Sequence, residues 1–129
     1  MQDELLLRHS RQIMLPQVDI IGQQRLNQST VLIFGLGGLG SPVAMYLAAA
    51  GVGHLLLSDF DRVDLSNLQR QLLHNTADIG KGKAESAQAT LSALNPEIRL
   101  TTIEERLDES ALTRWVRQAD LVIDASDNF

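Results

Sequence analysis

The stretch from Val31 to Asp59 constrains the fold of this 129-residue chain more than any other. It opens with four consecutive apolar residues, Val31–Phe34, which predict a strand buried on both faces. A glycine-rich turn, a predicted helix over Val43–Ala50 and a second predicted strand over His54–Ser58 follow. Asp59 stands at the end of that strand, about twenty residues past the glycines, where a dinucleotide fold binds a ribose hydroxyl. The stretch therefore predicts a βαβ unit with a nucleotide site.

The turn itself has the glycine spacing of a phosphate-binding loop. Gly35, Gly37 and Gly40 fit the pattern G-x-G-x-x-G, and Gly38 adds a fourth glycine. Such glycines allow a tight turn and let a phosphate approach backbone N–H groups at a helix N-terminus. Pro42 falls in the first helical turn, where its missing N–H is tolerated. A glycine-rich turn alone is a weak signal, and its place between two strands and before an acid strengthens it.

The rest of the chain continues the alternation of helices and strands. Apolar spacing and helix-ending residues predict further helices over Asp3–Leu15, Asp19–Asn27, Lys83–Leu94 and Glu109–Gln118, and further strands over Ile98–Ile103 and Leu121–Asp124. We therefore expect an α/β fold with a Rossmann-like, doubly wound, mainly parallel sheet and an N-terminal helical arm. Residues 1–129 are expected to form a single nucleotide-binding domain, with the arm at 1–29 and the core at 30–129. Because such sheets continue past a fourth strand, we expect this core to be incomplete and the chain to be partial.

Composition excludes several classes of function. The net charge of −5 argues against a surface for nucleic acid. The chain has no cysteine, and hence no disulfide or thiolate metal site. An acidic N-terminus lacks the positive region of a signal peptide, and no apolar run reaches membrane-spanning length, so a cytoplasmic location is the default expectation and no membrane partner is expected.

A polar segment follows Asp59, at the sheet edge where ligands of open α/β sheets bind. Its chemistry-bearing residues are Asp61, Asp64, Ser66, Asn67, Arg70, Lys81 and Lys83. Ser66–Gln71 could form one helical turn with Ser66 as its cap. Arg70 and Lys83 are of the type that neutralises a triphosphate, although either could simply face solvent.

Two classes of enzyme fit a glycine turn followed by an acid. In a nicotinamide-dependent (NAD) oxidoreductase, backbone amides donate most of the hydrogen bonds that the pyrophosphate accepts. An ATP-using enzyme needs cations for the phosphates and a carboxylate for Mg²⁺. Arg70, Lys83 and Asp127 supply those needs at one predicted rim of the sheet, and they favour ATP.

The chain also resembles a known family over essentially its whole length. The resemblance rests on RHSRQI from Arg8, GLGGLGSP from Gly35, DFDRVDLSNLQRQ from Asp59, GKGKAES around Lys83, ALNP from Ala93 and DASDN from Asp124. Together these motifs are similar to the ThiF/MoeB family of bacterial adenylyltransferases, which are related to ubiquitin-activating enzymes. The molybdopterin-synthase branch is the nearer resemblance, and the thiazole-biosynthesis branch remains open.

The resemblance implies an enzyme that binds Mg-ATP and adenylates the C-terminal glycine of a ubiquitin-like sulfur-carrier protein that ends in Gly-Gly. It also implies a homodimer in which Arg11 reaches the ATP phosphates of the opposite subunit, whereas residue type alone would leave Arg11 on the surface. Family members are about twice as long and carry Cys-x-x-Cys pairs for zinc, for which this chain has no ligands. An inactive fragment of an adenylyltransferase is therefore a further alternative.

Carried over by motif, the resemblance also implies roles for individual residues. Gly38 lies in the ATP-binding turn, Asp59 holds the ribose, and Asp127 binds Mg²⁺ with Asn128 beside it. The remaining residues implied to line the nucleotide are Ser66, Asn67, Leu68, Gln69, Arg70 and Lys83, with Asn67, Arg70 and Lys83 on the phosphates.

Overall fold

The computed structural model describes residues 19–63 and 74–126. Within these residues, one sheet contains the strands β1 (Thr30–Phe34), β2 (His54–Ser58), β3 (Arg99–Ile103) and β4 (Leu121–Asp124). All of its pairings are parallel, and the strand order is β3-β2-β1-β4. This order is that of the first half of a Rossmann sheet, with β1 and β2 at its centre. The predicted Rossmann-like α/β fold is confirmed.

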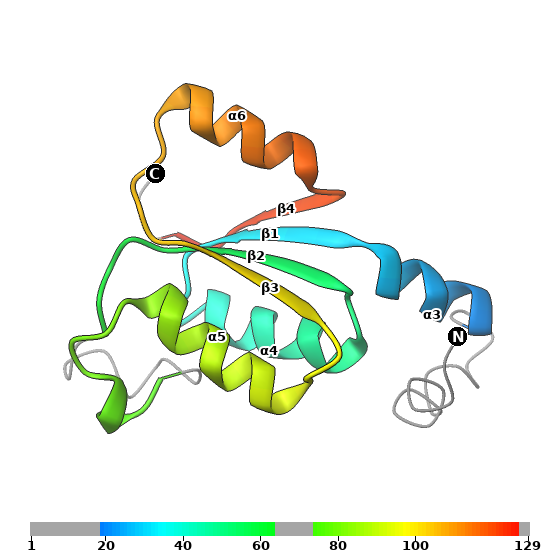
Figure 1. Cartoon of the computed structure of the whole chain (residues 1–129), viewed down its shortest axis with the longest axis horizontal. Coiled ribbons are helices and arrows are strands. Elements are labelled where there is room, and N and C mark those ends of the chain that lie inside the picture. The colour runs from blue at the N-terminus through cyan, green and yellow to red at the C-terminus, as the bar shows by residue number, and fades with distance from the viewer. Residues whose placement is uncertain (1–18, 64–73, 127–129) are drawn as a thin grey trace.

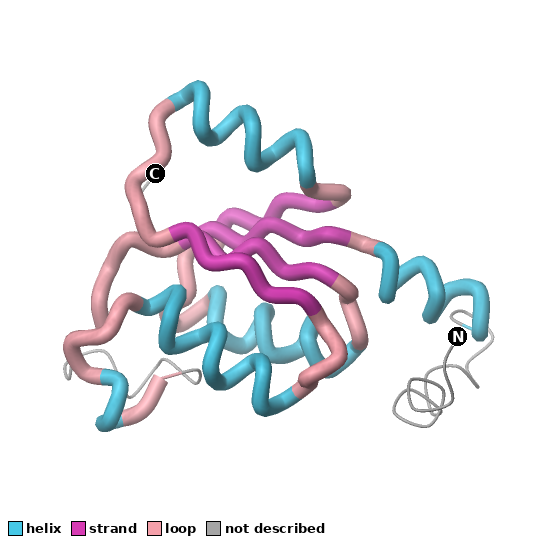
Figure 2. Tube along the Cα trace, in the orientation of Figure 1, coloured by secondary structure: helices cyan, strands magenta, loops and turns pink. Residues whose placement is uncertain are grey.

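Helices cover both faces of the sheet, as a doubly wound fold requires. The described helices are α3 (Asp19–Gln28), α4 (Gly40–Ala50), α5 (Lys83–Leu94) and α6 (Glu109–Gln118), with a short 3-10 helix, η2, at Thr76–Asp78. Helices α4 and α5 lie under the sheet in Figure 1, whereas α6 lies on the opposite face. The trace in Figure 2 shows the same two layers around the strands, and α3 extends away from the amino end of β1.

The buried side chains form one cluster on each face of the sheet. Successive residues of each central strand belong to different clusters, because successive side chains of a strand point to opposite faces. Ile33 and Leu57 pack with the alanines of α4 and α5, and Leu32 and Leu56 pack on the other face with Ile103. Trp115 of α6 is half-buried against this second cluster. Trp115 therefore packs α6 against the sheet.

Most predicted element boundaries hold, and the exceptions have local causes. Helix α4 begins at Gly40, three residues before the predicted Val43, because the helix starts directly from the glycine turn. Leu94, the last residue of α5, is 41% exposed. The next residue, Asn95, is buried instead. Its Nδ2 donates a hydrogen bond to the Ala48 carbonyl at 2.9 Å.

The structure shows a side-chain cap on α6 and short ordered elements in the polar segment after β2. The Asp108 carboxylate accepts a hydrogen bond from Ala111 N at 2.7 Å, as expected of the N-cap of α6. The segment between Asp59 and Lys83, predicted as a polar loop, contains η2 and a bridge between Arg62 and Gly82. The predicted helix over 3–15 and the predicted turn over 66–71 lie outside the described residues.

Candidate functional site

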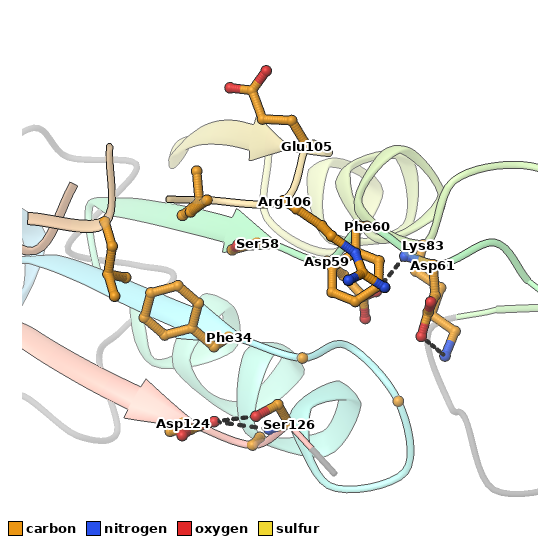
Figure 3. A pocket seen from close by; sticks show the side chains of 15 residues that line it. Phe34, Ser58, Asp59, Phe60, Asp61, Lys83, Glu105, Arg106, Asp124 and Ser126 are labelled. Atoms are coloured by element: carbon orange, nitrogen blue, oxygen red, sulfur yellow. Dashed lines mark hydrogen bonds and ion pairs between the residues drawn. The ribbon is translucent and has the colours of Figure 1, made fainter. Parts of the chain in front are cut away.

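A cavity of about 670 Å³ opens at the carboxyl ends of the strands. This volume lies in the range of small-molecule sites in proteins, roughly 300–1,000 Å³. Figure 3 shows its lining, with Asp59, Phe60, Asp61, Lys83 and Arg106 gathered at one side and Asp124 with Ser126 at another. The lining residues are Phe34, Gly35, Gly37, Ser58, Asp59, Phe60, Asp61, Lys83, Glu105, Arg106, Leu107, Leu112, Asp124, Ala125 and Ser126. The predicted sheet edge therefore does carry a ligand-sized space.

The glycines of the turn permit contacts that any larger residue would prevent. Gly35 has φ +90°, and a Cβ there would lie 2.8 Å from the backbone of Ala125 and Ser126. A Cβ on Gly40 would lie 1.7 Å from the Gly35 carbonyl oxygen. The first and third glycines of the pattern thus pack the turn against α4 and the end of β4. Gly37 lines the cavity, where its backbone can meet a ligand.

The carboxylate of Asp59 accepts hydrogen bonds from the glycine turn and from the segment that follows β2. Its Oδ2 accepts from Leu36 N at 2.8 Å, and its Oδ1 accepts from Asp61 N at 2.8 Å. Each carboxylate oxygen can accept a further hydrogen bond. Asp59 can therefore receive a ligand hydroxyl without giving up these contacts.

Lys83 brings a buried positive charge to the cavity. Its side chain is 9% exposed, and its Nζ lies 3.9 Å from Asp61 Oδ2. The alternative that Lys83 simply faces solvent is therefore wrong. Lys83 is also the first residue of α5, where the helix dipole adds partial positive charge. An anionic ligand in the cavity would meet both charges.

Three cavity residues follow β3 and were missed in the sequence. The Arg106 guanidinium carbon lies 4.4 Å from the centroid of the Phe60 ring, a cation–π distance, and Glu105 and Leu107 flank it in the lining. The rule that pointed to Asp59 also applies to these residues, because they stand at the carboxyl end of a parallel strand.

Asp124 and Ser126 form the side of the cavity beside β4. Asp124 Oδ1 accepts from the Ser126 hydroxyl at 2.6 Å and from Ser126 N at 3.0 Å. These two hydrogen bonds lower the pKa of Asp124 below its ordinary value and keep it ionised. Ser126 lines the cavity together with Gly35 and Gly37 of the glycine turn.

His74 is a buried polar residue that no sequence pattern singles out. It is 7% exposed, with Nε2 2.9 Å from the Leu36 carbonyl oxygen and Nδ1 2.6 Å from Ser86 Oγ. Burial lowers the pKa of His74, and the nearby Lys83 acts in the same direction, against the hydrogen bond to Leu36. The ring thus lies directly behind the glycine turn.

The structure places some of the predicted site residues and leaves others outside the described part. Asp59 and Lys83 line one cavity, whereas Gly38 is exposed in the turn and is not among the lining residues. The predicted residues that lie outside the described ranges are Arg11, Ser66, Asn67, Leu68, Gln69, Arg70, Asp127 and Asn128.

The described residues can be compared with the metals considered in the sequence. Within 19–63 and 74–126, no three His, Cys, Asp or Glu side chains are grouped as a metal site. The cavity does offer carboxylate oxygens from Asp59, Asp61 and Asp124, which are the ligand type that Mg²⁺ prefers. A thiolate zinc site does not fit a chain without cysteine.

In the part of the chain that is described, no helix has the length and apolar character to cross a bilayer.

Comparison with known proteins gives consistent matches. The model of the ThiF family matches residues 9–129. The sulfur carrier protein ThiS adenylyltransferase of Escherichia coli is 52% identical over 128 residues, which are 99% of this chain and 51% of that protein. The molybdopterin-synthase adenylyltransferase of the same organism is 49% identical over the same shares.

A solved structure with a bound nucleotide is also similar. The E. coli tRNA N6-threonylcarbamoyladenosine dehydratase TcdA, in complex with ATP, superposes with a TM-score of 0.90 at 27% identity, over 98% of this chain and 52% of that one. The chain spans about half the length of the curated relatives it matches. Relatives from the thiamine and molybdopterin pathways are about equally similar to it.

Proposed function

The chain belongs to the ThiF family, and from that premise we propose that it binds ATP in the cavity at the carboxyl ends of the strands and forms the ATP-binding part of an adenylyltransferase. The observation that carries the proposal is the buried Lys83 ammonium, which shares the cavity with the glycine turn and Asp59. A dinucleotide site of the NAD type needs no such cation, because backbone amides donate most of the hydrogen bonds that the pyrophosphate accepts.

The acceptor in this proposal is the C-terminal glycine of a ubiquitin-like sulfur-carrier protein that ends in Gly-Gly. Two relatives support the choice by name, one acting on the sulfur carrier protein ThiS and the other on molybdopterin synthase. A third, 48% identical over 122 residues, is named a SAMP-activating enzyme E1 in Haloferax volcanii. Whether the carrier serves molybdopterin or thiamine synthesis is left to the assay below.

The proposed reaction is a displacement at the α-phosphate of ATP. An oxygen of the carrier carboxylate forms a bond to the α-phosphorus, the bond to the β-phosphate oxygen breaks, and pyrophosphate leaves with its electron pair. Because a terminal carboxyl has a pKa of roughly 3.3–3.7, the nucleophile is already ionised and no general base is needed. The barrier lies in bringing anions together, so positioning and charge stabilisation supply the catalysis.

The described residues have defined parts in this proposal. Asp59 accepts a ribose hydroxyl, Gly37 and Gly38 present the turn to the phosphates, and Lys83 neutralises developing charge on the departing pyrophosphate. Outside the described ranges, Asp127 with Asn128 beside it would hold Mg²⁺, which would supply a Lewis acid to the phosphate oxygens.

Other residues in the proposal lie outside the described ranges. The residues proposed to complete the nucleotide site are Ser66, Asn67, Leu68, Gln69 and Arg70. In the proposed homodimer, Arg11 of the partner subunit reaches the phosphates.

Carrier-dependent ATP–pyrophosphate exchange in the intact protein tests the proposal. Lys83→Ala and Arg70→Ala are each expected to lower the exchange rate on the order of a hundredfold, because each removes a cation from the transition state. Lys81→Ala is the matched control, since Lys81 is 53% exposed on its side chain and pairs with Asp78 outside the cavity.

The outcomes separate the alternatives. Exchange at the wild-type rate in both the Lys83 and Arg70 variants would refute their assigned roles. Binding of NAD without binding of ATP would support an oxidoreductase instead. Binding of ATP without any carrier-dependent exchange, tested against carriers of both pathways, would identify an inactive relative.

A further inference from the structure

The buried histidine behind the glycine turn joins two parts of the proposed ATP site. A carbonyl oxygen can only accept, so the 2.9 Å contact with Leu36 places a proton on His74 Nε2. In the neutral ring, Nδ1 is then the acceptor for the Ser86 hydroxyl at 2.6 Å. Both ring nitrogens are satisfied, and the tautomer follows from the Leu36 contact.

Leu36 is the point at which the turn is held. Its N–H donates to Asp59 Oδ2 at 2.8 Å, and its carbonyl accepts from Ser41 Oγ at 3.0 Å as well as from His74. The Leu36 side chain is fully buried. The peptide groups of this residue are thus fixed by the end of β2, by α4 and by His74.

Ser86 connects the same ring to the cation of the site. Ser86 is 1% exposed on α5, one helical turn after Lys83 at the start of that helix. Residues three apart on a helix lie on one side of it, so the ring bonds to α5 just behind the lysine. Two hydrogen bonds therefore connect the turn that would meet the phosphates to the helix that carries the ammonium.

We propose that His74 is a positioning residue that sets the distance between the glycine turn and the Lys83 end of α5, so that backbone amides and ammonium meet the phosphates together. The inference rests on the proposed binding of ATP and adds to it a residue that touches no ligand. A leucine could fill the same space but could make neither bond. A glutamine carries a donor group and an acceptor group, as the neutral ring does.

The test compares phosphate binding with binding of the nucleoside alone, in the intact protein. His74→Leu removes both hydrogen bonds, His74→Gln keeps a donor and an acceptor, and Ser86→Ala removes only the helix side of the bridge. His54→Leu is the matched control, because His54 lies at the amino end of β2, away from the cavity lining, where its Nε2 is 2.7 Å from the Thr101 hydroxyl. Affinities for ATP and for adenosine are measured by calorimetry, together with exchange kinetics, below the melting temperature of every variant.

His74→Leu is expected to weaken ATP binding by about tenfold or more and to leave adenosine binding within about twofold, since small misplacements of positioned groups have large effects on their interactions. Ser86→Ala is expected to shift the same ratio by less, and His74→Gln to restore most of it. His54→Leu is expected to change neither affinity.

Equal losses for ATP and adenosine in His74→Leu would overturn the inference, because they would indicate general damage. An unchanged ATP affinity would overturn it as well. If His74→Leu does not fold, the ratio measured in Ser86→Ala decides in the same way. A wild-type protein that binds ATP but shows no carrier-dependent exchange refutes the adenylyltransferase proposal alone, since the ratio still tests His74.

Discussion

Two glycines with nearly the same positive φ allow the packing of the turn to be measured. Gly35 and Gly80 have φ +90° and +88°. A Cβ on Gly35 would lie 2.8 Å from backbone atoms of Ala125 and Ser126, whereas a Cβ on Gly80 would have no atom within 4 Å. Alanine at either position therefore meets the same backbone strain, and only alanine at Gly35 also meets a collision.

The two costs can be estimated separately. A residue with a Cβ in the left-handed region is destabilised by about 1–2 kcal/mol, and this is the whole effect expected for Gly80→Ala. Overpacking against groups that cannot turn aside adds about 1–3 kcal/mol, so Gly35→Ala is expected to lose about 2–5 kcal/mol in total. The collision is with backbone, so β4 must move away from the turn.

Urea denaturation of the intact protein, followed by circular dichroism, measures both free energies of unfolding. Binding of ATP by each variant gives a second readout, because the displaced backbone of Ala125 and Ser126 lines the cavity and the segment around Gly80 does not. Gly35→Ala is expected to weaken ATP binding, and Gly80→Ala to leave it unchanged. Equal losses of stability in the two variants would refute the packing argument, since the strain they share would then explain everything.

Two further predictions concern stability. Burial is the main cause that lowers the pKa of His74 and of His54 below the ordinary 6.5, so the unfolded chain binds more protons near that pH, and the free energy of unfolding is expected to fall as the pH drops below about 6.5. Urea titrations above and below that pH measure it, His74→Gln should flatten part of the dependence, and a stability that rises on acidification contradicts the reasoning. Leu56→Ala, at a fully buried residue of β2, is expected to lose about 2–5 kcal/mol, whereas Leu94→Ala, 41% exposed, should lose about 0.5 kcal/mol or less. Equal losses in the same urea assay would show that burial does not set the difference.

Much of the fold could be predicted from the sequence because its signals are local. The second strand, His54–Ser58, and the helix Glu109–Gln118 were predicted with the bounds they have in the structure. Apolar runs and helix-ending residues act over a few residues, so they can be recognised along the chain. The boundary of α4 could not, because that helix begins at Gly40, where the turn packs so closely that a Cβ would collide with the carbonyl oxygen of Gly35.

The site was predicted only where a residue's place in the chain fixed its place in space. Asp59 ends a parallel strand, and the order of the strands brought it to the cavity with the glycine turn. The sequence did not decide whether Lys83 is buried or exposed, because a lysine at the start of a helix can face solvent or a cavity with equal ease. The structure decided between them through the packing of α5 against β2 and β3.

The sequence by itself determined the βαβ alternation, the glycine turn and the acid after β2, since each depends on residues close together in the chain. The tertiary structure alone decided that Arg106 stacks on Phe60 and that His74 bonds to Leu36, 38 residues away. Such contacts form between segments that are brought together only when the sheet assembles. The sequence around one partner does not predict which residue the other partner is. For this reason the strands and the turn could be predicted in the sequence, whereas the residues that hold the turn in place could be found only in the folded chain.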